Sequence, residues 1–144
     1  MPELEDHLAQ IPHAAAIGMT FVSRGADTCV VRVPYAEHLV GDPDTGVVHG
    51  GVITALLDNA SGMAVRTDAS QFTEDRSMAT LDLRIDYMRP AQPREDLYCE
   101  ATCYRMTANV AFVRAIAFHA NDRDDPIASS VATFMLGTPT TPRP

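Results

Sequence analysis

The chain contains no lysine and no tryptophan, and its few cysteines follow neither a metal-binding nor a disulfide pattern. There are three of them, Cys29, Cys99 and Cys103, an odd number without C-x-x-C spacing. This pattern argues against a disulfide framework and a zinc site, so we expect buried, reduced packing residues. Arginine supplies all 11 basic residues against 19 acidic ones, and the net charge of -8 would repel a nucleic acid.

Long hydrophobic runs are also missing, because no apolar stretch approaches the roughly 20 residues that a membrane-spanning helix needs. The first residues, MPELEDHLAQ, are acidic and include neither a basic leader nor an apolar segment, which predicts a cytoplasmic protein without a secretory signal. With 46% hydrophobic residues, a chain of 144 residues is expected to fold as one domain, residues 1–144, around a sizeable core.

The pattern along the chain predicts a short helix, two strands, one long helix and four more strands. A first helix is expected at 3–9, and Pro12 interrupts it before a further turn at 13–16. Turn-forming residues predict a loop at 41–46. The expected strands, from their β-branched and alternating residues, are 18–24, 28–34, 77–88, 95–106, 110–119 and 127–137.

The long helix is expected at 52–66, VITALLDNASGMAVR, which is almost wholly apolar and must therefore be surrounded by protein. In LDLRIDY, residues 81–87, apolar and charged residues alternate with the period of a half-buried strand. Two strands, a buried helix and four strands with short connections predict an α+β fold. In this fold an antiparallel sheet of about six strands wraps around one long central helix.

The stretch Val48-His49-Gly50-Gly51 runs directly into this helix. Glycines let the backbone approach a ligand closely, and the unpaired amides of a first helical turn favour negative charge. A developing oxyanion is one such charge. For so short a motif, a tight turn without chemistry is the alternative interpretation.

Asp58 is a carboxylate in the middle of the apolar helix, where burial is costly unless the group is paired or functional. Together with Thr54 and Ser61 it forms a polar stripe at i, i+4 and i+7. The alternative is a purely structural network in which Asp58 accepts hydrogen bonds from its neighbours.

The spacing also bears on assembly, since Asp58 stands two turns past Gly51, about 10 Å along the helix axis. One carbonyl group cannot easily touch both. If the Gly50 N–H binds the oxygen and Asp58 delivers the water, the two groups come from different chains. The sequence therefore predicts a site at a dimer interface, with two sites per dimer.

The string HGGVITALLDNASG at 49–62, followed by ATLDLRIDYMRPA at 79–91, resembles the hotdog-fold acyl-CoA thioesterases of the phenylacetate-degradation, or PaaI-like, type. The resemblance extends over about residues 17–136, and the nine-residue step from His49 to Asp58 is its most specific mark. It implies a six-stranded antiparallel sheet around a long helix, a homodimer or dimers paired into tetramers, and hydrolysis of acyl-CoA without a metal or any cofactor beyond the coenzyme A of the substrate.

The resemblance also implies the catalytic residues. Gly50 matches the backbone oxyanion donor, and His49 matches the histidine that supports its turn. Asp58 matches the carboxylate that activates water or attacks directly, and Thr80 supplies the hydroxyl that positions the water. The positions expected to line the coenzyme or substrate channel are Asp82, Tyr87, Arg89 and Arg105; for the arginines, solvated charges at strand ends are the alternative. The acyl pocket is expected to include Met63, Phe112 and Phe134.

The sequence departs from the family pattern in the loop before the long helix. The family usually carries an asparagine six residues before the histidine, whereas this chain has Pro43, although the glycine three before the histidine is present as Gly46. Proline cannot donate a hydrogen bond to the thioester carbonyl. Either a neighbour, Asp42 or Asp44, takes part, or Gly50 carries the oxyanion alone.

Two other functions stay open on this basis. A non-catalytic acyl-CoA-binding module would keep the pocket while losing turnover, as Pro43 favours and the retained Asp58 disfavours. A hydratase or dehydratase on the same fold is the enzymatic alternative, but its signature helix is not evident. A serine hydrolase is disfavoured because no G-x-S-x-G elbow exists.

Overall fold

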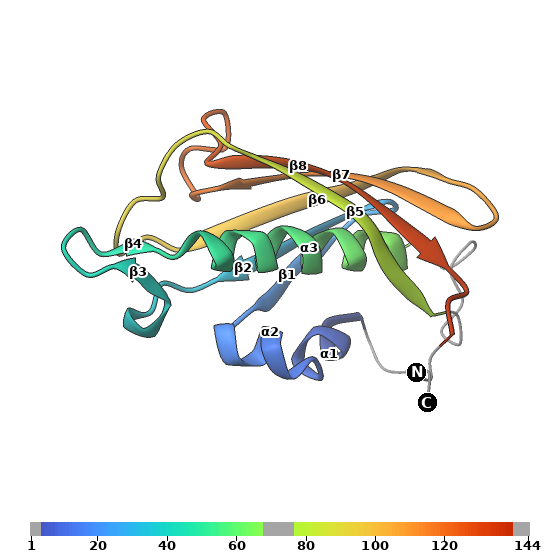
Figure 1. The fold of residues 1–144 in the computed structure, drawn as a ribbon, viewed down its shortest axis with the longest axis horizontal. Helices are drawn as coiled ribbons and strands as arrows, with labels where there is room; N and C mark the ends of the chain where they lie inside the picture. The colour runs from blue at the N-terminus through green and yellow to red at the C-terminus, as the bar shows by residue number, and fades with distance from the viewer. Residues whose placement is uncertain (1–3, 68–76, 140–144) are drawn as a thin grey trace.

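One antiparallel sheet lies across one long helix in the computed structural model, which describes residues 4–67 and 77–139 (Figure 1). The six strands of the sheet follow the order β1-β2-β6-β7-β8-β5. Their bounds are β1 Thr20–Arg24, β2 Thr28–Val33, β5 Met78–Tyr87, β6 Leu97–Met106, β7 Val110–Phe118 and β8 Ala128–Leu136. The predicted α+β architecture and all six predicted strands are confirmed, with ends shifted by one or two residues.

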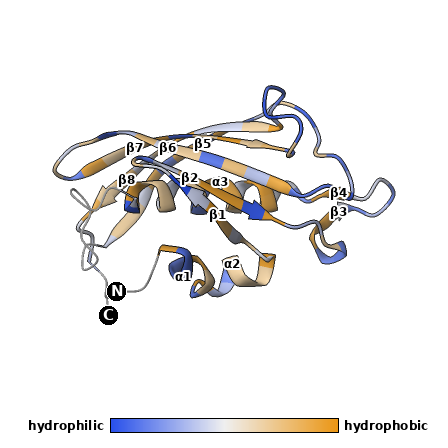
Figure 2. Cartoon of the chain, turned by 180° about the vertical axis from the view of Figure 1, so that it is seen from behind, coloured by the Kyte–Doolittle hydropathy of each residue, from blue (hydrophilic) through white to orange (hydrophobic). Residues whose placement is uncertain are grey.

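The central helix, α3, spans Gly50–Arg66 and packs against β2, β6, β7 and β8. Its buried side chains include Leu56, Leu57 and Val65, which meet the inward-facing residues of the strands. Figure 2 shows hydrophobic residues along this interface and hydrophilic ones in the loop between β3 and β4. Burial of this apolar helix is what joins sheet and helix into one core.

Two short helices, α1 Leu4–Ala9 and α2 Pro12–Ile17, lie against the side of α3 away from β7 and β8 (Figure 1). The helix expected at 3–9 is confirmed over its described residues; residue 3 lies outside them. Pro12 separates the two helices as expected, and it does so as the first residue of α2, a position where its missing N–H costs nothing. Gly18, with φ of 86°, then ends α2.

The loop expected at 41–46 lies inside a small second sheet that the sequence did not predict. A 3-10 helix, Glu37–Leu39, leads into β3 Val40–Asp42, which pairs with β4 Val47–Val48. Gly46 has a φ of 77°, which only glycine adopts without strain. This hairpin brings the chain to the first residue of α3.

A β-bulge in β5 decides which of its side chains face α3. Thr80 pairs with Phe134, and Asp82 pairs with the adjacent Thr133, so Leu81 is an extra residue without a partner of its own. Strict alternation back from Tyr87 would turn Leu81 inward and Thr80 outward. The bulge reverses this: Thr80 faces the helix, and Leu81 is 54% exposed.

The connection into β6 is held by polar groups around Asp96. Its carboxylate accepts hydrogen bonds from the Tyr35 N–H at 2.9 Å and from the Arg32 guanidinium at 2.7 Å. The buried His119 accepts from the Gln92 N–H at 2.8 Å, so its other ring nitrogen carries the proton and donates to the Asp96 carbonyl at 2.9 Å. The Tyr35 N–H, together with Arg32, holds the pKa of the Asp96 carboxyl below its ordinary value.

This arrangement predicts a pH-dependent loss of stability in Asp96→Asn. Because the pKa of Asp96 is lower in the folded state, its charge stabilises the fold above about pH 4, and this contribution disappears as the pH falls through the folded-state pKa. After allowance for solvent screening, we expect the free energy of unfolding of Asp96→Asn to be about 1 kcal/mol below that of the wild type at pH 7. This difference between variant and wild type should shrink near pH 3. Urea unfolding at both pH values measures it.

Asp86→Asn is the matched control, since Asp86 pairs with Arg84 at 3.4 Å where both side chains are exposed. Its removal should leave stability almost unchanged. The stabilising role of the Asp96 charge would be contradicted if both variants lost the same free energy of unfolding. It would also be contradicted if the loss in Asp96→Asn were as large at pH 3 as at pH 7.

Candidate active site

The first turn of α3 is built around His49, which caps the helix. Its Nδ1 accepts a hydrogen bond from the Gly51 N–H at 2.8 Å, so the neutral ring carries its proton on Nε2. Gly51 must be a glycine for this contact, because a Cβ there would lie 2.8 Å from Nδ1. The Gly50 N–H is exposed and donates no hydrogen bond within the described part of the chain. It is therefore an open donor at the positive end of a 17-residue helix.

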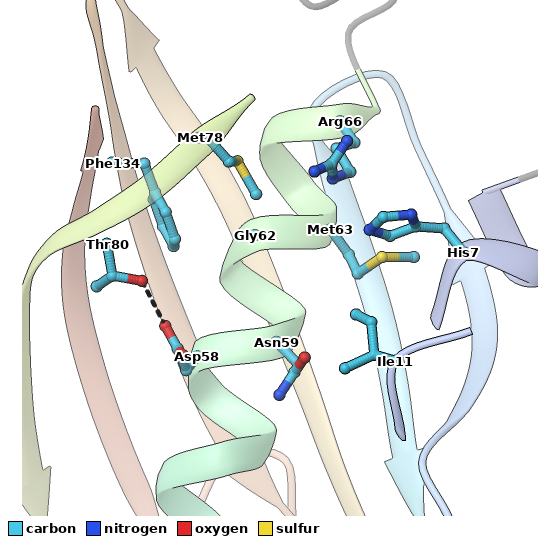
Figure 3. Close-up of a pocket in the computed structure, with 10 residues that line it drawn as sticks. All are labelled: His7, Ile11, Asp58, Asn59, Gly62, Met63, Arg66, Met78, Thr80 and Phe134. Carbon is cyan, nitrogen blue, oxygen red and sulfur yellow. Dashed lines mark hydrogen bonds between the residues drawn. The ribbon is translucent and has the colours of Figure 1, made fainter. Parts of the chain in front are cut away.

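Asp58 lies in the middle of α3 and faces β5. The hydroxyl of Thr80 donates to its Oδ1 at 3.1 Å (Figure 3). Asp58 is half-buried rather than enclosed, so one carboxylate oxygen is engaged by Thr80 and the group stays open to a ligand. The structure thus brings together Asp58 and Thr80, the carboxylate and the hydroxyl to which the resemblance gave adjoining roles.

A pocket of about 130 Å³ adjoins this pair (Figure 3). Its wall combines apolar side chains from α3, β5 and β8 with polar groups near the end of the helix. The lining residues are His7, Ile11, Asp58, Asn59, Gly62, Met63, Arg66, Met78, Thr80 and Phe134. Burial, and after it the charge of Arg66, lowers the pKa of His7, which favours a neutral imidazole at this wall.

Gly62, one turn beyond Asp58, keeps this pocket open. A Cβ at Gly62 would lie 2.9 Å from the terminal methyl of Met78 and 3.9 Å from the Phe134 ring. Met63 and Phe134 line the pocket as expected. Phe112 does not line it; the side chain stands on the other face of the sheet beside Tyr104, with ring centroids 6.4 Å apart.

The Gly50 N–H opens into a different pocket, of about 380 Å³, at the other end of α3. This second pocket is lined mainly by apolar residues of the β4–α3 junction and of the segment after β5, among them Val48, Ile53, Tyr87 and Met88. Gly50 and Asp58 are separated by two turns, roughly 12 Å along the axis. Within one chain the open donor and the carboxylate therefore serve separate pockets.

Two of the four residues expected to bind coenzyme or substrate, Tyr87 and Arg89, line the pocket of about 380 Å³ together with Gly50. The Tyr87 hydroxyl reaches the Gly50 carbonyl at 3.3 Å. The Arg89 guanidinium also donates to the Asp125 carbonyl at 2.7 Å and contacts the Asp125 carboxylate at 3.3 Å. Arg89 thus ties the β7–β8 loop to the segment after β5.

The other two expected binding residues lie away from both pockets. Asp82 lies on the outer face of the sheet with Arg84 and Asp86, and pairs with Thr133. Arg105 is exposed near the far end of β6 and pairs with Phe112, three strands from β5 and at the opposite end of the sheet from Tyr87. The sequence did not identify His7 and Arg66, which line the pocket beside Asp58, because neither residue belongs to a motif that marks it.

The loop that carries Pro43 has no amide side chain to replace the missing asparagine. Asp42 uses one carboxylate oxygen to accept the Asp44 N–H at 3.0 Å, and the Thr45 hydroxyl accepts the Val47 N–H at 3.3 Å. Pro43 itself lines a pocket with Tyr35 and Arg94. Within a single chain, the Gly50 N–H is therefore left without a neighbouring side-chain donor from this loop.

Other nucleophiles and ligand sets contribute nothing here. Burial raises the pKa of the Cys29 thiol to about 12 and raises that of Cys99 as well, which keeps both protonated; both are buried and free as expected, whereas Cys103 is only partly buried. Over residues 4–67 and 77–139, no three His, Cys, Asp or Glu side chains are grouped to hold a metal ion. No helix in the same ranges is long and apolar enough to cross a membrane.

Comparison with known proteins assigns the family. The model of the thioesterase superfamily matches residues 45–125. The medium/long-chain acyl-CoA thioesterase YigI of Escherichia coli is 28% identical over 137 residues, 88% of this chain and 86% of that protein. A crystallised protein of Pseudomonas aeruginosa is 39% identical, with a TM-score of 0.80 over 92% of this chain and 95% of the other.

The phenylacetic acid degradation protein PaaI of Thermus thermophilus, in the structure of a point mutant, shares the fold. It is 22% identical, with a TM-score of 0.71 over 86% of this chain and 97% of that one. The superfamily match covers more than half of the chain, and the six-stranded sheet wraps around one long helix as the resemblance implied. The chain therefore belongs to the thioesterase superfamily, as a hotdog-fold thioester hydrolase.

Proposed function

We propose that the chain hydrolyses acyl-CoA thioesters at a site shared by two chains. The Gly50 N–H of one chain polarises the thioester carbonyl, and Asp58 of the partner acts on the carbonyl carbon from the other side. The observation that carries the proposal is the hydrogen bond of 3.1 Å from Thr80 to Asp58 beside a pocket. The β-bulge that turns the Thr80 hydroxyl toward this half-buried carboxylate supports a functional role, since bulges often re-aim side chains next to active sites.

Two chemical routes use the same groups. As a general base, Asp58 takes a proton from a water molecule held by Thr80, and the oxygen of that water bonds to the carbonyl carbon. The negative charge then gathers on the carbonyl oxygen, where the Gly50 N–H and the helix N-terminus stabilise it. The C–S bond breaks, the thiolate of coenzyme A takes up the proton that Asp58 had accepted from water, and the free acid leaves. As a nucleophile, Asp58 would instead attack the carbonyl carbon and expel the thiolate of coenzyme A, and water would then hydrolyse the resulting anhydride to the free acid and regenerate the Asp58 carboxylate.

The free edge of β5 supports the two-chain arrangement. Among the described strands β5 has one partner, β8, and its exposed side chains include Leu81 and Tyr87. The strand runs antiparallel to α3, so its end at Tyr87 lies beside Gly50 and its start at Thr80 lies beside Asp58. Antiparallel pairing of two β5 edges about a two-fold axis would set Tyr87 of one chain against Thr80 of the other, and hence Gly50 against Asp58.

The acyl group is proposed to enter the pocket of about 130 Å³ beside Asp58. A cavity of roughly 150 Å³ is known to hold one benzene molecule, so this pocket suits a ring-sized or short acyl group. Coenzyme A would extend the other way, along the apolar pocket near Gly50 of the partner. Pairing of dimers into tetramers, a cytoplasmic location and a single domain over 1–144 are further proposals, and they rest on the sequence analysis.

A non-catalytic acyl-CoA-binding module is the second candidate, and Pro43 is the observation that favours it. With no amide in the loop at 41–46, the carbonyl oxygen would be held by fewer donors than the resemblance implies. Such a module would bind acyl-CoA and release no coenzyme A.

Replacing Gly50 by proline tests the oxyanion donor directly. Proline removes the N–H yet is favoured at the first helical position. His49, with φ of -57° and ψ of 135°, already has the extended conformation that proline requires before it. A Cβ at Gly50 meets no atom within 4 Å. We expect release of coenzyme A to slow by ~100-fold or more, with little loss of thermal stability.

Gly50→Ala is the control for Gly50→Pro, because it adds the same Cβ while keeping the N–H; it should lose far less activity.

Asp58→Ala should slow turnover by ~100-fold or more. If no thioester is cleaved by the wild type while acyl-CoA binds equally to wild type and Asp58→Ala, the binding-module proposal replaces hydrolysis. If Gly50→Pro and Gly50→Ala are equally active, Gly50 is not the donor.

Gly62→Ala tests the acyl pocket. The new methyl group lies 2.9 Å from the flexible end of Met78, so the helix should tolerate it and gain roughly 0.5 to 1 kcal/mol from the better helix former. It narrows the space next to Asp58, so kcat/KM for phenylacetyl-CoA or hexanoyl-CoA should fall by about 10-fold or more relative to that for acetyl-CoA. An equal change for all three substrates would mean that the acyl group binds elsewhere.

A further inference from the structure

The peptide that joins Gly50 to Gly51 is held at both of its ends. Its N–H donates to Nδ1 of His49 at 2.8 Å. Its carbonyl oxygen lies within hydrogen-bond distance of two side-chain hydroxyls, that of Thr54 at 3.2 Å and that of Tyr87 at 3.3 Å. The two hydroxyls also lie within hydrogen-bond distance of each other. Each hydroxyl has one proton, so one donates to the carbonyl while the other donates either to the carbonyl or to its neighbour. Three side chains from three places in the chain thus converge on one peptide group.

Burial does not account for the position of Tyr87. Its side chain is 53% exposed, at the last residue of the edge strand, yet its hydroxyl is directed onto the first turn of α3. Thr54 stands one turn along the helix and could have bonded its own backbone alone. The pair instead links the end of β5 to the start of the helix.

The clamped peptide adjoins the proposed oxyanion donor. Gly50 has no side chain to restrict its backbone, so the direction of its N–H depends on what holds the groups on either side. A donor has to lie within about 2.7–3.1 Å of the developing oxyanion to be effective, and a displacement of about 1 Å in a catalytic group can cost ~100-fold in rate. Because Pro43 supplies no second donor, the orientation of the Gly50 N–H matters more here.

We propose that Tyr87 and Thr54 are positioning residues that hold the Gly50 N–H in the direction required for catalysis. This proposal rests on the oxyanion role of Gly50 in the proposed function. It gives Tyr87 a role other than the coenzyme or substrate contact that the sequence suggested. It also adds Thr54, to which the resemblance assigned no role.

Tyr87→Phe and Thr54→Val test the clamp, because each removes a hydroxyl while keeping the shape of the side chain. We expect kcat for an acyl-CoA substrate to fall by about 10-fold in each, with KM changed by less than about 2-fold and the melting temperature lowered by only a few degrees. Thr54→Ser keeps the hydroxyl and should recover most of the loss in kcat. A rise in KM with unchanged kcat would overturn the proposal and indicate a direct contact with substrate.

Tyr35→Phe is the matched control. The Tyr35 hydroxyl donates to the Gly46 carbonyl at 2.8 Å, the same kind of bond between tyrosine and a glycine carbonyl, but outside α3. It should cost comparable stability and leave kcat near that of the wild type. If Tyr35→Phe and Tyr87→Phe lower kcat equally, a general loosening of the chain explains the effect and the clamp is overturned.

A double-mutant comparison separates this proposal from the proposed function. If the clamp acts through the Gly50 N–H, adding Tyr87→Phe to Gly50→Pro should cost almost nothing more. If the two losses multiply, Tyr87 acts by another route and the clamp is wrong. If Gly50→Pro alone keeps wild-type activity, the oxyanion assignment of the proposed function fails first, and the clamp fails with it.

Discussion

One straight helix carries both groups that the proposed chemistry needs, and its rise keeps them apart. Gly50 begins α3 and Asp58 follows two turns later, roughly 12 Å along the axis. Because a helix cannot bring its own ends together, one thioester carbonyl cannot reach both groups of a single chain, which is why we propose that the second group comes from a partner chain. The edge strand β5 repeats this separation, since it contacts α3 at Gly50 through Tyr87 and at Asp58 through Thr80. A two-fold axis on that edge converts the constraint into two complete sites.

The strand that would form such an interface is also the strand that orients the site. The bulge at Leu81 turns Thr80 inward, so that its hydroxyl reaches Asp58. The same bulge leaves Leu81 exposed on the outer side of an edge with a single described partner, β8. The Tyr87 hydroxyl at the other end holds the first turn of the helix. In the proposed dimer, catalytic geometry and association would therefore both depend on this one strand.

Much of the fold could be predicted from the sequence because its signals are periodic. The apolar run at 52–66 has the length of a helix and is too hydrophobic to be exposed to solvent, and apolar and charged residues alternate in LDLRIDY as they do in a strand. The bulge could not be predicted, since one extra residue in a strand leaves no compositional mark, and alternation alone puts Leu81 in the core. The small β3–β4 sheet was missed because its strands, of two and three residues, are too short to show a period.

The site was partly predictable for a similar reason. A carboxylate in an apolar helix and a glycine pair at its start are local features, so Asp58 and Gly50 could be identified as candidates from the sequence alone. Side-chain partners that lie far apart in the sequence could not be identified in this way. The ion pair of Arg89 with Asp125, and the position of Arg105 at the opposite end of the sheet from Tyr87, follow only from the three-dimensional fold. A charged residue in a strand shows its type and, by alternation, its face, but not its partner.

If each site takes Gly50 from one chain and Asp58 from another, a mixed dimer of two different inactive chains should regain activity. Gly50→Pro and Asp58→Ala chains, each with its own affinity tag, would be co-expressed and isolated through both tags, and coenzyme A release measured. In a shared site, one site of the mixed dimer carries both defects and the other carries none, so about half of the wild-type activity should return from two inactive parents. A mixed dimer as inactive as its parents would mean that each site is built within one chain, and the account would be wrong.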